Sequence, residues 1–285
     1  MSANSFKTPI SLSGIIEPAE TLKVQASAGG RIIVLHVDEN QRVSEGQLLL
    51  TLKNDSQKRK LELSRLQLKI NENNVFDSNT QITISNNNVE DLETNLRDIK
   101  RRLTEEKTLF EQGSSTRSQF DSLQLQYSRG EVSLKNAKLT LEKSKISMLK
   151  SQLTLERSYQ ELAMSEEALD DTQLKAKIGG FIVAKSVEEG EIISPGAILF
   201  QIININQVEI PILVEEADLP LIKEGQPVVF TTPSYRDKEF SGIIDRISWS
   251  ADPETGQFPL YIKATNPGLK LRAGMSAKVY LLRQK

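Results

Sequence analysis

The sequence predicts an elongated, multi-domain α+β fold in which a long helical hairpin separates two β-rich regions. Three observations predict it. Glycine and proline are concentrated at the two ends of the chain, apolar residues recur every seven positions in the middle, and one segment is repeated on both sides of that middle. Together they indicate the chain order β, then long α, then β.

The composition excludes several classes of protein. The chain has 285 residues, of which 38% are hydrophobic, and this is enough for about two domains with apolar cores. A net charge of −2 and an aromatic content of 5% argue against a nucleic-acid-binding protein. The absence of cysteine excludes disulfides, thiolate chemistry and cysteine-ligated zinc.

Residues 54–173 form the predicted helical region. No proline lies between Pro18 and Pro195, and the only glycines between Gly46 and Gly179 are Gly113 and Gly130. Proline breaks helices and glycine weakens them, so a stretch nearly free of both favours continuous helix.

Two heptad series run through this region. Counting by sevens back from Phe110 to Leu61, and on from Phe120 to Leu169, every position is apolar or aromatic. Such repeats predict left-handed supercoiling. Beside the second series, a seam of small residues lets two helices approach closely; after Leu123 it comprises Gly130, Ala137, Ser144, Ser151, Ser158 and Ser165.

The two series are joined by a predicted turn. Gly113, Ser114 and Ser115 are typical turn residues, so the helices should fold back on each other with a tip near 111–117 and bring Phe110 close to Phe120.

The segment 71–88 is rich in Asn and Ser, which favour helices poorly, yet it keeps the seven-residue register. We expect it to be a helical but weak segment that exchanges its amide hydrogens first.

A direct repeat flanks the helices. The segment that begins at Ala26 returns at Ala176 with a constant offset of 150 residues and no gap. We interpret its recurring glycines as structural turns, in the pairs Gly30 with Gly180 and Gly46 with Gly196. Each copy has too few strands to bury a face alone, so residues 23–53 and 174–203 should be two halves of one sandwich.

This arrangement resembles a known family. The two repeat copies resemble the halves of a lipoyl/biotinyl-like domain, and a coiled-coil hairpin inserted between them is similar to the periplasmic adaptors, or membrane fusion proteins, of bacterial tripartite efflux pumps (HlyD/RND-adaptor type). The resemblance continues through VEIPILVEEADLPLIKEGQPVVF, FSGIIDRIS and NPGLKLRAGMSAKVYL. It implies a small β-barrel over 204–285 with a turn at Gly274, and an N-terminal segment, 1–22, that joins the barrel or a membrane-proximal region.

The resemblance also implies a partner-binding site at the hairpin tip. Family members dock on an outer-membrane channel through a leucine late in the first helix and a serine early in the second, which correspond to Leu109 and Thr116 here. Gly113, Ser115 and Arg117 complete the predicted site. Glu105 stands where the family has an arginine, a charge reversal for which Arg101, Arg102 or Arg117 would have to substitute. Thr116 has a structural alternative as the N-cap of the second helix.

The implied function is architectural. The chain would be a non-catalytic periplasmic adaptor for small-molecule efflux that bridges an inner-membrane RND or ABC transporter and an outer-membrane channel of the TolC type. It would associate into a ring, by resemblance a hexamer, and be tethered to the inner membrane by a segment outside this chain. Alternatives are an adaptor of an ABC or type I secretion exporter and a structural coiled-coil protein without a transport role.

An enzyme is the least favoured class. The single histidine, His36, aligns with Ser186 in the other repeat copy, so the repeat shares no chemistry at this position. In lipoyl-type carriers the modified lysine lies on the hairpin that joins the two halves, and here the insertion of the helices has replaced that hairpin. We therefore predict no catalytic residues, no metal site and no cofactor.

Overall fold

The computed structural model describes residues 10–281 and divides the chain into two compact units, one formed by the helices over 54–169 and the other by the β-rich segments on both sides. Residues 1–9 of the predicted N-terminal segment and the last four residues of the predicted barrel lie outside the described range. In chain order, the elements before the helices are β1 (Ile10–Ile15), β2 (Glu17–Gln25), β3 (Gly30–Leu35), β4 (Arg42–Val43) and β5 (Leu48–Leu52).

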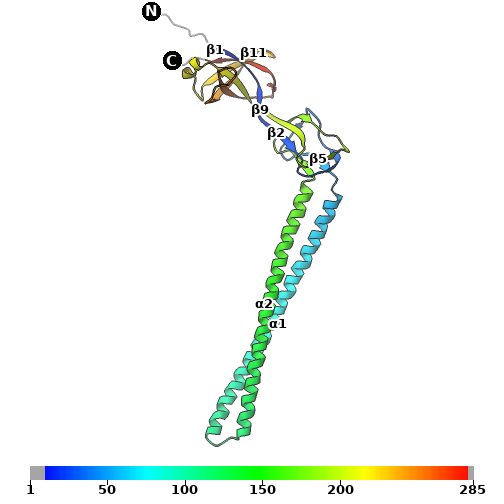
Figure 1. Ribbon diagram of the computed structural model, residues 1–285, viewed down its shortest axis with the longest axis vertical. Helices are drawn as coiled ribbons and strands as arrows, with labels where there is room; N and C mark the ends of the chain where they lie inside the picture. Colours follow the sequence, from blue (N-terminus) through cyan, green and yellow to red (C-terminus); the bar gives the residue numbers. More distant parts are fainter. Residues whose placement is uncertain (1–9, 282–285) are drawn as a thin grey trace, which may run out of the picture. The chain divides into compact units, whose positions relative to one another are not determined.

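The helical unit is an antiparallel hairpin. Helices α1 (Asp55–Glu111) and α2 (Arg117–Asp170) lie side by side and exchange sides along their length, as a supercoil requires (Figure 1). With 57 residues and a rise of about 1.5 Å per residue, α1 is about 85 Å long. It runs without a break through the Asn- and Ser-rich segment 71–88, as predicted.

The interior of the hairpin follows both predicted heptad series, but its centre is polar. The small residues of α2 meet hydroxyl and amide side chains of α1, every seventh residue, in four hydrogen-bonded pairs. These pairs are Ser64–Ser165 at 2.8 Å, Asn71–Ser158 at 2.8 Å, Ser78–Ser151 at 2.9 Å and Ser85–Ser144 at 3.1 Å. Because buried polar groups need partners, each pair disfavours a shift of one helix along the other. The ladder therefore fixes the register of the hairpin.

The two repeat copies form one barrel-sandwich by exchanging strands. After the helices the chain continues with β6 (Gln173–Lys175), β7 (Gly180–Lys185) and β8 (Ile192–Ile193). Strand β3 pairs with β8 of the other copy, and β4 pairs with β7, so the two pairings are equivalent under the repeat. Their shared core contains apolar residues of both copies, including Ile32, Leu49, Ile182 and Leu199.

The structure corrects part of the predicted glycine roles. Gly46 and Gly196 have φ values of 79° and 82°, and Gly274 has 87°, which places all three in the left-handed region that turns require. Gly30 and Gly180, however, are the first residues of strands β3 and β7. Glycine is needed at Gly180 for space, because an added Cβ would lie 2.1 Å from the carbonyl oxygen of Ile203.

The remaining strands build the β-barrel. They are β9 (Ile198–Val214), β10 (Pro227–Thr232), β11 (Tyr235–Ile247), β12 (Phe258–Thr265) and β13 (Ser276–Leu281), with a 3₁₀ turn, η1, at Glu216–Leu221. The strand order is β1-β13-β10-β11-β12-β9, and β1 also packs against β9 where Gly14 approaches Pro211. Strand β9 pairs with β7 near its start and with β12 near its end, so it is shared by sandwich and barrel.

Within the described residues, neither helix contains an apolar stretch that would suit a membrane span.

Candidate partner-binding site at the hairpin tip

The end of α1 is closed by a Schellman motif. Gly113 has φ 73°, a conformation that glycine adopts without a side-chain penalty. Its N–H donates to the carbonyl oxygen of Phe110 at 3.0 Å, and the N–H of Ser114 donates to that of Leu109 at 2.9 Å. The predicted turn residue Gly113 therefore terminates the helix, and the chain reverses within the next few residues.

The start of α2 is closed by a capping box. The N–H of Thr116 donates to Oε1 of Gln119 at 3.1 Å, and the N–H of Gln119 donates to Oγ1 of Thr116 at 3.4 Å. The Thr116 hydroxyl also donates to Gln119 Oε1 at 2.7 Å. The hydroxyl group is thus already engaged within the tip, in the capping role that the sequence offered as the alternative to docking.

An aromatic pair locks the two helix ends together. The rings of Phe110 and Phe120 stack with their centroids 5.6 Å apart, which confirms the predicted proximity. Since Phe110 occupies the seam, the adjacent Leu109 is turned outward and 44% of it is exposed. Below the turn, the Ser115 hydroxyl donates to Glu106, which ties the turn back to α1. The tip is thereby a rigid loop that presents an apolar side chain.

The basic residues around the tip all have acidic neighbours. Arg101 and Arg102 each lie 2.7 Å from a carboxylate oxygen of Asp98, and the hydrogen bond from Arg101 lowers the pKa of Asp98 from its ordinary value. Arg101 also reaches Glu105 at 3.9 Å. Arg117 lies 3.7 Å from Asp121 and is largely exposed. A partner that binds these guanidinium groups must therefore compete with acids of the same helix.

A row of exposed apolar residues along α2 was missed by the sequence reasoning. Leu125, Val132, Leu139, Ile146 and Leu153 are spaced by seven and are each 52–65% exposed. They lie on the outer face of α2, opposite the seam that contacts α1. Counting by sevens from Leu125 would have found them, because the same period that marks the interior marks this face.

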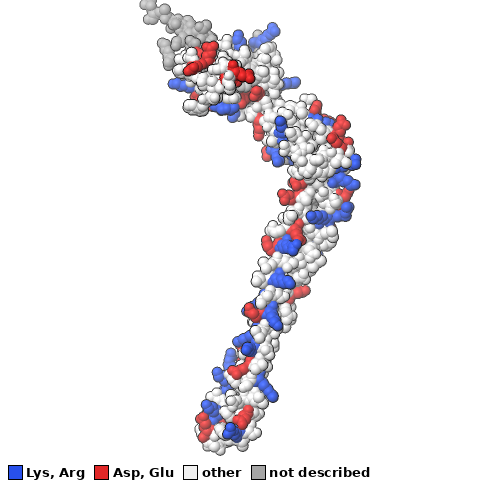
Figure 2. Space-filling model, in the orientation of Figure 1, with Lys and Arg blue, Asp and Glu red and all other residues white. Residues whose placement is uncertain are grey.

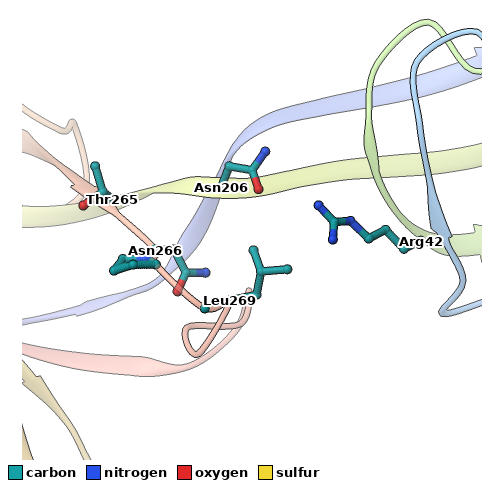
Figure 3. A pocket seen from close by; sticks show the side chains of 7 residues that line it. Arg42, Asn206, Thr265, Asn266 and Leu269 are labelled. Carbon is teal, nitrogen blue, oxygen red and sulfur yellow. The ribbon is translucent and has the colours of Figure 1, made fainter.

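Two further places could bear chemistry. At the junction of sandwich and barrel, a hollow of about 540 Å³ is lined by Arg42, Asn206, Thr265, Asn266, Pro267, Gly268 and Leu269. Figure 3 shows Arg42 extending toward Asn206 and Leu269. Arg42 is the one charged side chain of this lining, so no acid–base pair converges there. The other place is His36, whose Nε2 lies 3.0 Å from the Thr51 hydroxyl.

Comparison with known proteins agrees with this architecture. Residues 20–205 match a family model described as the barrel-sandwich hybrid domain of RND membrane fusion proteins. The chain belongs to the membrane fusion protein family of periplasmic adaptors. Residues 207–285 match a second model, described as a CusB-like β-barrel domain.

Individual relatives are distant. The chain is 33% identical to nodulation protein NolF of Rhizobium meliloti over 115 residues. This alignment covers 40% of this chain and 31% of NolF. The chain is 28% identical to the pyoverdine export membrane fusion protein PvdR of Pseudomonas aeruginosa over 85 residues. This alignment covers 30% of this chain and 22% of PvdR. The chain therefore aligns with about a third or less of the length of these two relatives.

The fold agrees with that of a solved protein structure. The crystal structure of MacA from Actinobacillus actinomycetemcomitans superposes with a TM-score of 0.69 and 20% identity over 97% of this chain and 79% of that one. Members of the family are non-catalytic periplasmic adaptors that are anchored to the inner membrane and work with an inner-membrane transporter and an outer-membrane channel.

Proposed function

We propose that this membrane fusion protein is the adaptor of a small-molecule efflux pump, and that it engages an outer-membrane channel of the TolC type through Leu109 at the hairpin tip. The observation that carries the proposal is the construction of the tip. A Schellman motif, a capping box and a ring stack hold the turn, and Leu109 stays exposed beside them. A preformed apolar contact loses little conformational entropy when a partner binds.

The barrel would contact the inner-membrane transporter. The only tryptophan of the chain, Trp249, follows strand β11 and is 100% exposed. Its loop is held by Asp252, whose carboxylate accepts hydrogen bonds from the N–H groups of Glu254 and Thr255 at 3.0 and 2.9 Å. Exposed aromatic residues on ordered loops are typical anchors of protein interfaces. Both family models name RND systems, which favours an RND transporter as this partner.

Assembly and location complete the proposal. Adaptor copies would form a ring, as a hexamer, in the periplasm, with each copy tethered to the inner membrane. The exported compound would pass through the ring, and no bond would be made or broken by the protein.

An export assay tests the tip. Deletion of the gene first defines, within a panel of dyes and antibiotics, the compounds whose export depends on this protein. Leu109→Asp should then abolish export of those compounds, because a buried carboxylate would oppose docking. Met164→Asp is the matched control, since Met164, on α2, is likewise an exposed apolar residue but lies far from the tip. Full export with Leu109→Asp, at unchanged protein level, would refute the role of the tip.

A further inference from the structure

The hollow where the barrel-sandwich meets the β-barrel has the size of a small-molecule site. Its volume of about 540 Å³ falls within the range of about 300–1,000 Å³ that is typical of ligand pockets. Arg42 enters it from β4 and Asn206 from β9, and residues 265–269, at the end of β12 and just beyond it, form the remaining wall. The lining therefore comes from three separate segments of the chain.

The polar side chains of the hollow have unused hydrogen-bonding groups. Among the described residues, exposed Arg42 has no acidic partner within ion-pair distance, and the side-chain amide of Asn206 has no hydrogen-bond partner. Figure 3 shows both side chains extending into the same space beside Leu269. A guanidinium presents a planar fork of N–H groups that matches a carboxylate, and an amide can donate one further hydrogen bond. On the face shown in Figure 2, basic and acidic residues are mixed over the β-rich unit, so no broad basic surface there would attract anions in general.

The internal repeat shows that the sandwich itself does not need an arginine at this position. By the offset of 150 residues, Arg42 on β4 corresponds to Ile192 on β8. The two strands make equivalent pairings, yet β4 lies at the edge of the sheet that β9 continues into the barrel, whereas β8 lies in the other sheet. The charged side chain therefore occurs only in the copy whose strand shares a sheet with the barrel, and the other copy has an apolar residue there.

The apolar wall of the hollow is held in an unfavourable backbone conformation. Leu269 has φ 52°, in the left-handed region that residues other than glycine rarely adopt. Buried Asn266 fixes this turn: its Nδ2 donates to the carbonyl oxygens of Ile205 and Leu271 at 2.9 and 2.8 Å, and its Oδ1 accepts from the N–H of Leu271 at 2.9 Å. Leu269 is only partly buried, so core packing does not account for its strained position. Such strain is typical of residues that contact a ligand.

We propose that this hollow binds a small amphipathic monocarboxylate, with its carboxylate on Arg42 and Asn206 and its apolar part against Leu269. Arg42 is the one charged residue of the lining, and a single guanidinium balances one negative charge, which favours a carboxylate over a phosphate ion. The apolar wall favours a ligand with a hydrocarbon body over a bare anion. A ligand bound here would contact both β domains and hold their junction in one arrangement. The site uses no residue of the hairpin and adds ligand binding to the proposed adaptor function.

Calorimetric titration of the full chain with octanoate, which joins one carboxylate to a hydrocarbon tail, tests the site. We expect saturable binding with a Kd below about 1 mM. Arg42→Gln should weaken this binding at least about tenfold, because the carboxylate then loses its charged partner. Octan-1-ol lacks the charge, and acetate and inorganic phosphate lack the apolar body, so each should bind the natural chain at least about tenfold more weakly than octanoate.

The repeat and the strained turn supply two matched variants. Combining Arg42→Gln with Ile192→Arg restores the net charge and places an arginine at the equivalent position of the other copy, so octanoate binding should stay weak. Leu269→Asn removes the apolar contact but introduces a residue that tolerates the left-handed conformation. It should weaken octanoate binding at least about threefold, while the melting temperature stays the same or rises. Circular dichroism of each variant checks that the fold is retained.

Each of the opposite results overturns the proposal. No binding of octanoate, or unchanged affinity in Arg42→Gln, would show that the hollow is not the site, and recovery of affinity through Ile192→Arg would show attraction by charge alone. Equal affinity for octan-1-ol, acetate or phosphate would contradict an amphipathic carboxylate. A lowered melting temperature with unchanged affinity in Leu269→Asn would assign that leucine to the fold. The titration needs neither transporter nor channel, so its failure leaves the adaptor function standing, while failure of the export assay leaves this result standing.

Discussion

Glu39 and Glu189 join the two repeat copies through equivalent hydrogen bonds, because the carboxylate of each accepts from a backbone N–H of the other copy. Oε1 of Glu39 accepts from the N–H of Lys185 at 3.0 Å, and Oε1 of Glu189 accepts from the N–H of Leu35 at 2.7 Å. The offset of 150 residues relates both the two acids and the two donors. The acidic turn is therefore repeated because each copy uses it to hold a strand of the other.

Removal of either carboxylate should destabilise the sandwich. Glu39→Ala and Glu189→Ala are each expected to lower the free energy of unfolding by about 1 kcal/mol, and the double variant by about 2 kcal/mol, since the two bonds are separate. Glu→Gln keeps an acceptor oxygen and should lose less. Calorimetry of the four single variants and the double variant checks this. Equal losses for Ala and Gln would show that the hydrogen bonds contribute nothing.

Two glycines should respond to alanine with opposite signs. At Gly180 a new Cβ would lie 2.1 Å from the backbone oxygen of Ile203, which cannot move away without shifting β9, so Gly180→Ala should cost about 2 kcal/mol or more. At Gly130 the nearest atom, at 2.8 Å, is the terminal Cδ1 of Leu96, which can rotate. Gly130→Ala should then stabilise α2 by about 0.5–1 kcal/mol through helix propensity. Thermal unfolding measures both, and a stabilising Gly180→Ala would contradict the close packing described.

Loss of the cap should loosen the start of α2. Thr116→Ala removes the oxygen that accepts from Gln119, so the helix should lose about 1 kcal/mol, while Thr116→Ser keeps the capping box and should lose little. Hydrogen exchange of the amides in residues 117–120 reports the change locally. Unchanged exchange in Thr116→Ala would show that the hydroxyl is free for another role.

The link between the helices should depend on pH. Nζ of Lys138 lies 2.6 Å from Oε1 of Glu93, and this hydrogen bond lowers the pKa of Glu93 below its ordinary 4.5. A carboxyl group with a lowered folded-state pKa stabilises the fold at neutral pH, and this contribution is lost as the pH falls through that pKa. The melting temperature of the natural chain should thus exceed that of Glu93→Gln at pH 7, and the difference should shrink as the pH falls through the lowered pKa of Glu93. A constant difference would assign the effect to something other than charge.

The hairpin and the repeat were predictable because their periods are long and regular. Phe110 and Phe120 could be placed together from heptad counting, and the gap-free repeat predicted one sandwich of two halves without showing which strands pair. The polar partners on α1, such as Asn71 opposite Ser158, were not predicted, because serine and asparagine signal surface or turn in isolation and become interior only when two helices are aligned. Gly30 was predicted in a turn but begins strand β3. The sequence alone does not distinguish the two, because glycine occurs both in turns and in strands that another part of the chain approaches closely.

The most direct test of the account is cross-linking at the tip in living cells. A photoreactive residue at Leu109, in cells that export through this protein, should yield a covalent adduct with an outer-membrane channel, and the same residue at Met164 should not. A tip that yields no channel adduct while export proceeds would contradict the claim that the hairpin is a docking arm.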